Sequence, residues 1–103
     1  MSAHTPGPWT LFPAPRGVAI DGPCRVTIAW CGENASFGEN SYKISRDEAL
    51  ANARLVGAAP DLLEALIMIR DADDDCARDG LQTIPAPARA KIDAAIAKAE
   101  GKP

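Results

Sequence analysis

The sequence predicts an α+β fold, in which a small antiparallel sheet of three to four strands is followed by two to three helices packed on one of its faces. In the N-terminal half, β-rich runs alternate with turn sequences. In the C-terminal half, apolar residues recur at helical spacing. The pattern changes near Ser45, which opens a helix-capping sequence.

The first half predicts an extended entry segment, a short strand and a hairpin. Two prolines restrict the backbone of the entry segment, residues 1–8. Trp9–Phe12 is predicted as a strand that ends at the following proline. Gly17–Asp21 and Arg25–Cys31 are separated by a turn sequence and predict a hairpin. Ser41–Ile44 is a candidate edge strand.

Side-chain alternation along these strands predicts two different faces of the sheet. The face expected to line the core carries the large apolar residues Trp9, Leu11, Val18, Ile20, Val26, Ile28 and Trp30. The opposite face is expected to carry Thr10, Phe12, Ala19, Arg25, Thr27, Ala29 and Cys31.

The second half predicts three helices. Ser45 and Glu48 have the spacing of a capping box, which predicts a helix from Arg46 to about Ala58. Proline cannot continue that helix but suits the first turn of a new one, predicted over Pro60 to about Ala72. A third helix is predicted over Pro87–Glu100.

Length, charge and cysteine content narrow the classes of function. The 103 residues suit one domain, 1–103, and aromatic residues make up only 5% of them, so we expect a thin core and a homo-oligomer. Acidic residues outnumber basic ones 14 to 11, which argues against binding to a nucleic-acid backbone. Three cysteines without a CxxC motif, no secretory signal and no membrane-spanning run predict free thiols in the bacterial cytoplasm.

The acidic stretch Asp71–Asp79 is the sharpest local pattern. Extended to Gln82, it places oxygen-bearing side chains at positions 1, 3, 5, 9 and 12 of a calcium-binding loop. Cys76 replaces the glycine that such a loop needs at its sharp turn, and Gln82 replaces its bidentate glutamate. We therefore expect no metal and interpret the stretch as a solvated connection between helices, with calcium as the alternative. It is also a candidate acidic partner surface formed by Asp71, Asp73, Asp74, Asp75 and Asp79.

Catalytic residues do not form a recognisable set. The single histidine, His4, lies near the N-terminus, so a Ser–His or Cys–His pair would need that segment to be held in place. Cys24 and Cys31 are expected on opposite faces of a strand, which makes them poor ligands of one zinc ion. The sequence predicts no enzyme and no cofactor.

Asn52 and Arg54, in the first predicted helix, are the leading candidate binding residues. Asn52 has apolar neighbours and needs hydrogen-bond partners, which the sheet backbone or the entry segment could provide. Arg54 is expected to be an exposed partner of Asp47 or Glu48. Alternatively, Asn52 and Arg54 line a site for an anionic or planar ligand, since guanidinium groups suit phosphates and aromatic rings stack on bases. The other candidate members of that site are Arg25, Arg46, Phe37 and Tyr42.

Two segments resemble small proteins encoded by tailed phages and prophages. They are His4-Thr-Pro-Gly-Pro-Trp9 and Ala51-Asn-Ala-Arg-Leu-Val-Gly-Ala-Ala-Pro-Asp-Leu-Leu-Glu-Ala-Leu66. In that group a TPGPW opening precedes a β-rich middle and a segment similar to ANARLIAAAPDLLEAL. The match covers both ends of residues 4–66, and Gly57 departs from it where alanine is usual. The resemblance implies a phage origin and a helix–break–helix layout, but no activity.

Phage proteins of this size and acidity often act by binding, so we expect a counter-defence inhibitor. Its partner would be a host immune protein, such as a CRISPR effector, or a nucleotide immune signal that it sequesters. The alternative is a small oligomeric structural or adaptor protein of phage replication or assembly, with no immune target. Neither hypothesis involves a membrane or a nucleic-acid backbone.

Overall fold

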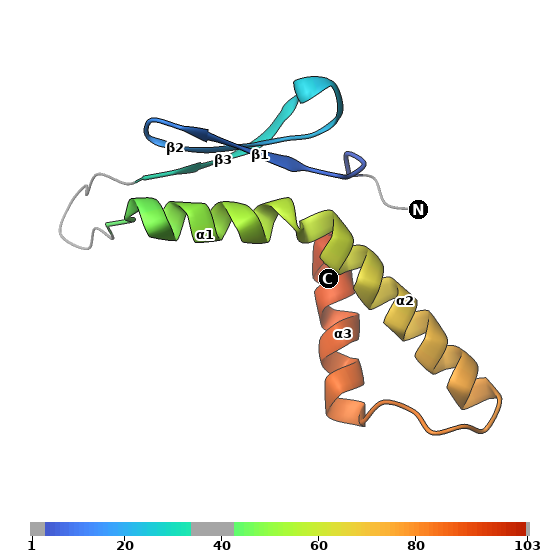
Figure 1. Ribbon diagram of the computed structural model, residues 1–103. Coiled ribbons are helices and arrows are strands. Elements are labelled where there is room, and N and C mark those ends of the chain that lie inside the picture. Colours follow the sequence, from blue (N-terminus) through green and yellow to red (C-terminus); the bar gives the residue numbers. More distant parts are fainter. Residues whose placement is uncertain (1–3, 34–42, 103) are drawn as a thin grey trace. The chain divides into compact units, whose positions relative to one another are not determined.

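The computed structural model describes residues 4–33 and 43–102, where three strands precede three α-helices (Figure 1). This arrangement confirms the predicted α+β fold. The elements in chain order are β1 (Thr10–Ala14), β2 (Gly17–Asp21), the 3-10 turn η1 (Pro23–Arg25), β3 (Thr27–Gly32), α1 (Arg46–Gly57), α2 (Ala59–Arg78) and α3 (Ala86–Ala99). The candidate edge strand over Ser41–Ile44 begins outside the described residues, and Lys43 and Ile44 do not form a strand.

The chain divides into two compact units. The sheet unit, His4–Pro60, contains the three strands and α1. The helical unit begins at Asp61 and contains α3 and nearly all of α2. The single domain over 1–103 stays a prediction.

The sheet is antiparallel, with strand order β1-β2-β3. The prediction that a proline ends the first strand was wrong, because Pro13 lies within β1 and pairs with Val18. Proline lacks an N–H donor, but β1 is an edge strand and one of its sides needs no partner. The strand therefore continues to Ala14.

The helix α1 packs on one face of the sheet and starts where the capping sequence predicts (Figure 1). The Ser45 hydroxyl accepts a hydrogen bond from the backbone N–H of Glu48 at 3.2 Å. Arg46 begins the helix, and its guanidinium donates to the carbonyl oxygens of Ala14 (2.7 Å) and Gly17 (3.1 Å). One residue thus ties the start of α1 to the turn between β1 and β2.

The face prediction was wrong for β3. Cys31 pairs with Val18 and Ala29 pairs with Ile20, so both small residues face α1 with the core. Trp30, predicted in the core, is 53% exposed on the opposite face, and Val26, also predicted in the core, is 59% exposed. The reason lies in the turn and the register: η1 contains two residues with left-handed backbone, and the pairing shifts by one residue beside Asp21.

Small side chains let α1 approach the sheet closely. Ala49 and Ala53 on α1 are fully buried, as are Val18 and Ile20 on the central strand β2. The partly buried residues around this cluster are Trp9, Leu11, Ala29, Cys31, Leu50 and Val56. The core of the sheet unit is therefore thin, and its largest fully buried side chain is that of Ile20 among the described residues.

The entry segment and β1 pack against the residues where α1 ends and α2 begins. Gly7 lies beside the ring of Pro60, since a Cβ placed on Gly7 would lie 3.4 Å from the ring carbons of Pro60. Gly57 leaves room for a methyl group of Leu11, and Trp9 donates a hydrogen bond from its indole N–H to the carbonyl of Thr5 at 3.1 Å. The two segments that carry the phage resemblance thus meet in the sheet unit.

The helix α2 is longer than predicted. It continues through the acidic stretch to Arg78, so the interpretation of Asp71–Asp79 as a connection was wrong. The cost of aspartate in a helix is only a few tenths of a kcal/mol per residue, and two of these aspartates, Asp73 and Asp74, bind Arg89 on α3. Gly80, with φ of 74°, follows α2, and α3 matches its prediction to within one residue at each end.

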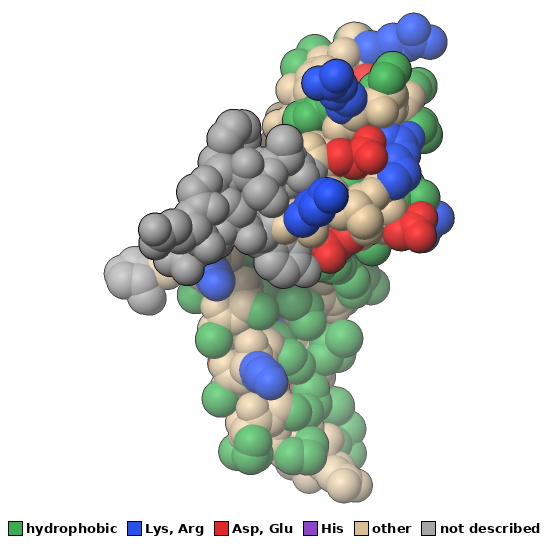
Figure 2. All heavy atoms as spheres, turned by 90° about the vertical axis from the view of Figure 1, so that its left-hand side faces the viewer, with side chains coloured by type: hydrophobic (Ala, Val, Ile, Leu, Met, Phe, Trp, Pro, Cys, Tyr) green, Lys and Arg blue, Asp and Glu red, His purple; other side chains and the backbone are tan. Residues whose placement is uncertain are grey.

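Large apolar side chains remain at the surface of both units. Hydrophobic side chains reach the surface beside charged ones on the face drawn in Figure 2. The exposed large ones are Phe12, Val26, Trp30, Leu55, Leu62, Met68, Ile69 and Leu81. None of the described helices combines the length and apolarity needed to cross a bilayer.

The thin core makes each buried side chain important to stability. We expect Ile20→Ala to lower the free energy of unfolding by about 2–5 kcal/mol, because the cavity cannot be refilled by the small neighbouring residues. Val26→Ala, at a site that is 59% exposed, should change it by less than about 0.5 kcal/mol. Urea unfolding of both variants measures the difference, and equal effects would contradict the described core.

Candidate functional site

The face of the sheet opposite α1, here called the outer sheet face, carries two exposed aromatic side chains. Phe12 pairs with Ala19, and Ala19 pairs with Trp30, so the three residues form one row across the strands. Phe12 is 41% exposed and Trp30 is 53% exposed. The small side chain of Ala19 separates the two rings and leaves both accessible.

Glycines under Trp30 fix its position. A Cβ at Gly17 would lie 2.6 Å from a ring carbon of Trp30, and a Cβ at Gly32 would lie 2.9 Å from its indole nitrogen. The indole therefore lies directly against the backbone of both residues, where only glycine leaves room. Trp30 is both exposed and held in place.

Polar groups border the aromatic row. The Arg25 guanidinium lies over the Phe12 ring, 5.8 Å from its centroid, within the range of a cation–π interaction. The hydroxyl of Thr27 donates a hydrogen bond to the Asp21 carboxylate at 3.1 Å. This end of the outer sheet face therefore carries charge and hydrogen-bonding groups beside its apolar surface.

The predicted anion site is not assembled from its arginines. Arg46 binds at the Gly17 end of β2 and also pairs with Glu33 at 3.4 Å. Arg25 lies beyond Asp21, at the other end of the same strand. The structure therefore separates Arg25 from Arg46 by the length of β2.

The other predicted members of that site lie on α1 or outside the described residues. Asn52 and Arg54 are exposed on α1. Over residues 4–33 and 43–102 neither side chain makes a hydrogen bond or ion pair, so the expected tether of Asn52 and ion pair of Arg54 are not formed. Phe37 and Tyr42 lie outside the described residues. The binding roles of all four residues stay predictions.

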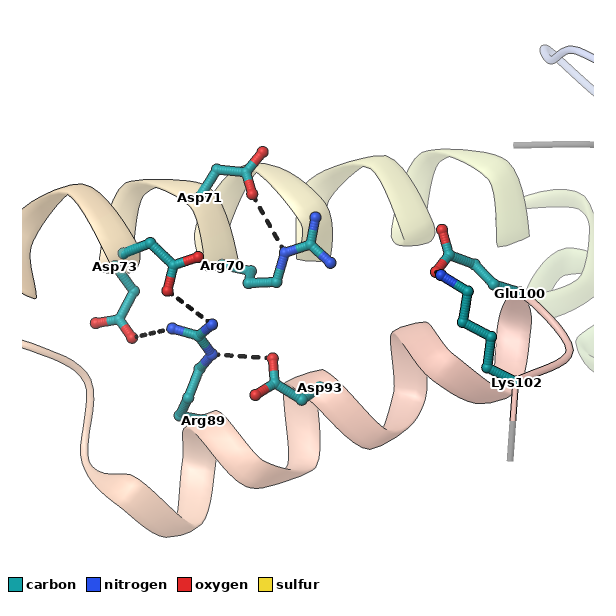
Figure 3. Close-up of polar contacts among 8 residues, drawn as sticks. Arg70, Asp71, Asp73, Arg89, Asp93, Glu100 and Lys102 are labelled. Carbon is teal, nitrogen blue, oxygen red and sulfur yellow. Dashed lines mark hydrogen bonds and ion pairs between the residues drawn. The ribbon is translucent and has the colours of Figure 1, made fainter. Parts of the chain in front are cut away.

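The acidic stretch contains a buried ion pair that joins α2 to α3 (Figure 3). Asp73 is 7% exposed and accepts hydrogen bonds from the Ile84 backbone N–H (2.8 Å) and from Arg89 (2.6 Å). Arg89 also binds Asp74 at 2.8 Å and Asp93 at 2.9 Å. The sequence showed the aspartates, but only the fold shows that Arg89 lies among them.

These contacts shift the pKa values of both partners toward their charged forms. The hydrogen bond from Ile84 and the one from Arg89 lower the pKa of Asp73, against the opposing effect of burial. Hydrogen bonds to Asp93, Asp73 and Asp74 raise the pKa of Arg89. Asp73 is thus a structural residue and not part of a free acidic surface.

The remaining members of the proposed acidic surface are exposed but paired. Asp71 pairs with Arg70 at 3.2 Å, while Asp75 and Asp79 pair with Arg78 at 2.9 and 3.8 Å. The calcium-loop alternative is wrong, because residues 71–78 are helical and their side chains point around the axis instead of converging. No metal-binding group of three or more His, Cys, Asp or Glu side chains occurs in the described ranges.

An open groove of about 470 Å³ lies beside α2. Its walls combine apolar side chains with one carboxylate and two neutral polar groups: Ile69, Ala72, Cys76, Ile84, Asp73, Gln82 and Thr83. The cysteine among them is a free thiol, as are Cys24 and Cys31. The groove offers no lysine or arginine to an anionic ligand.

The whole chain, residues 1–103, matches the family model described as Salmonella phage P22 protein Y8K6. The chain belongs to this family. Membership in the Y8K6 family confirms the phage origin that the TPGPW and ANARL segments indicated. No curated protein and no solved structure gives a significant match. Family membership therefore shows a phage origin and no particular activity.

The Asp73–Arg89 pair should give this Y8K6-family protein a pH-dependent stability. Because folding lowers the pKa of Asp73, its stabilising effect is complete above the unfolded value of 3.8 and is lost as the pH falls through the lower folded value. We expect Asp73→Asn to reduce the thermal midpoint at pH 7, and the difference from the original chain to shrink only below about pH 3.8. Circular dichroism at 222 nm follows the transition.

Asp71→Asn is the matched control, since it makes the same chemical change on the exposed side of the same helix. We expect it to leave the thermal midpoint nearly unchanged. An Asp71→Asn effect as large as that of Asp73→Asn would contradict the special role of the buried pair.

Proposed function

We propose that this phage protein is a non-enzymatic accessory protein that binds and inhibits a host defence protein, with the outer sheet face as its contact surface. The main support is the row formed by Phe12, Ala19 and Trp30, in which two aromatic side chains are exposed and held on a strand scaffold. Because the chain belongs to a phage family, a host protein is a reasonable partner. That host protein would bind to the outer sheet face.

The residue types on this face are those that contribute most to protein–protein binding. Tryptophan and arginine are enriched among residues whose truncation costs more than about 2 kcal/mol of binding free energy. Trp30 already lies against Gly17 and Gly32, so binding immobilises it at a small entropic cost. Arg25, stacked over Phe12, adds a cation that favours an acidic or carbonyl-rich partner surface.

A protein partner fits the described surfaces better than a nucleotide. Sequestering a nucleotide requires a concave site with cationic donors for its phosphates. The groove beside α2 contains the Asp73 carboxylate and no cation, and Arg25 lies on an open face separated from Arg46. These features favour a broad contact with a macromolecule.

The position of the single histidine supports a binding role over catalysis. The His4 ring hydrogen-bonds the carbonyl of Thr5 at 2.7 Å and lies edge-on to Trp9, with 6.1 Å between ring centroids. These partners neither activate a nucleophile nor orient the imidazole as a general base.

A small oligomeric adaptor of phage replication or assembly is the second candidate function. The exposed apolar side chains of α2, including Leu62 and Ile69, favour association of this kind. Deleting the gene and comparing phage plating on defended and undefended hosts separates the two functions. Counter-defence predicts a loss on defended hosts only, whereas an adaptor predicts an equal loss on both.

Substitutions on the outer sheet face should abolish binding without unfolding the protein. We expect Trp30→Ser and Phe12→Ser each to weaken capture of the host protein at least tenfold, or about 1.4 kcal/mol, and to remove the plating advantage on defended hosts. Leu55→Ser is the control, because it makes the same kind of apolar-to-polar change at a side chain that is 66% exposed on α1. Circular dichroism confirms that each variant is folded.

Two outcomes would contradict this proposal. Full activity of Trp30→Ser and Phe12→Ser would exclude the outer sheet face as the contact. A thermal shift with one member of a panel of cyclic and linear nucleotides, without capture of a host protein, would instead support sequestration of a nucleotide signal.

A further inference from the structure

The helix α2 has a second apolar stripe that is not used between α2 and α3. Leu62, Ile69 and Cys76 recur every seven residues, and Ala65 and Ala72 fall between them, which gives the alternating three-and-four spacing of a helix–helix seam. Leu62 is 48% exposed and Ile69 is 45% exposed. The groove beside α2 is lined by the C-terminal part of this stripe.

The helix α3 has a corresponding stripe of small residues. Ala88, Ala95 and Ala99 are exposed, whereas Ile96 is buried and Arg89 is occupied with the aspartates of α2. Alanines at helical spacing allow another helix to approach closely. This stripe can therefore accept larger side chains from a partner.

Both stripes emerge on the same side of the helix pair. On α2, Leu62 directly precedes the buried Leu63; on α3, Ala88 and Ala95 directly precede Arg89 and the buried Ile96. One residue corresponds to a rotation of about 100° around a helix. Because α2 and α3 run antiparallel, equal rotations in the same sense bring the two stripes to the same side. We call this surface the α2–α3 apolar face.

The α2–α3 apolar face is flanked by acidic residues on α2 and by lysines on α3. The helix α2 has six acidic residues and two arginines, and α3 has three basic residues and one acidic residue. Asp61 and Asp75 lie along the outer flank of the α2 stripe, and Lys91 and Lys98 lie along the outer flank of the α3 stripe. A partner that places an α3 opposite α2 would therefore pair these charges.

We propose that a second copy of this chain covers the α2–α3 apolar face, with α2 of each copy packed antiparallel to α3 of the other. This two-fold arrangement brings Asp61 and Asp75 near Lys98 and Lys91 of the second copy. Packing α2 against the α2 of the other copy would instead bring Asp61 near Asp75, which is repulsive. The large side chains of α2 then meet the alanines of α3.

The size of the face is sufficient for a stable dimer. Helices of 20 and 14 residues are about 30 and 21 Å long, so side by side they offer roughly 600 Å² per copy. The total of about 1,200 Å² reaches the lower end of specific protein interfaces. Among the described residues of the helical unit, only Leu63, Asp73 and Ile96 are buried. Dimerisation would therefore add a larger apolar core to this unit.

Sedimentation equilibrium of the full chain at micromolar concentration tests the proposal. We expect a mass of twice 10.8 kDa for the original chain and at least tenfold weaker association for Leu62→Gln and Ile69→Gln. Leu55→Gln, at an exposed leucine of the sheet unit, should leave association unchanged. Circular dichroism shows whether each variant keeps its helices. A monomeric original chain, or a dimer indifferent to both glutamine substitutions, would overturn the proposal.

A charge reversal tests how the helices pair and does not depend on apolar packing. Lys91→Glu with Lys98→Glu should weaken association at least tenfold at low salt, and adding Asp61→Lys with Asp75→Lys should restore it. Lys102→Glu, beyond the end of α3, is the control. Association unaffected by the double glutamate change, or weakened but not restored by the compensating lysines, would overturn the pairing of α2 with α3 of the second copy. Host-protein capture by Trp30 variants is measured separately, so either proposal can fail alone.

Discussion

The register between β2 and β3 determines which side chains this protein buries and which it presents. Antiparallel partners share a face, so Val18 and Ile20 bring Cys31 and Ala29 into the core beside α1. A register one residue different would bury Trp30 where the alanines of α1 leave no room. The close approach of α1 and the exposure of Trp30 are therefore two consequences of the same pairing.

The buried Asp73–Arg89 pair has the corresponding role in the helical unit. Asp73 binds both Ile84, which follows α2, and Arg89 near the start of α3. These contacts accompany a helix α2 that continues to Arg78 through a stretch whose composition favours a turn. On α2, Leu62 and Ile69 are 48% and 45% exposed beside the Asp73–Arg89 pair. The sheet unit and the helical unit thus each present one apolar surface, and we assign them to different partners.

Membership in the phage P22 Y8K6 family gives an origin to features that are otherwise hard to connect. The TPGPW segment and the segment Ala51–Leu66 carry the phage resemblance, and they lie together where Gly7 sits beside the ring of Pro60. The row proposed for host binding lies outside both segments, whereas Leu62 of the α2–α3 apolar face lies within the second one. Residues that identify the family and residues that bind partners need not be the same.

The sequence by itself determined the α+β order, the Ser45 cap and the limits of α1 and α3, because these depend on local hydrogen bonds and on helical periodicity. It also determined the limits of β2, because the alternation of apolar and other side chains that predicts a strand depends on that strand alone. Only the tertiary structure decided the facing of β3, the length of α2 and the burial of Asp73. Each depends on a partner distant in sequence: a strand register set through a left-handed turn, and an arginine 16 residues away. Local propensities of a few tenths of a kcal/mol cannot specify such contacts.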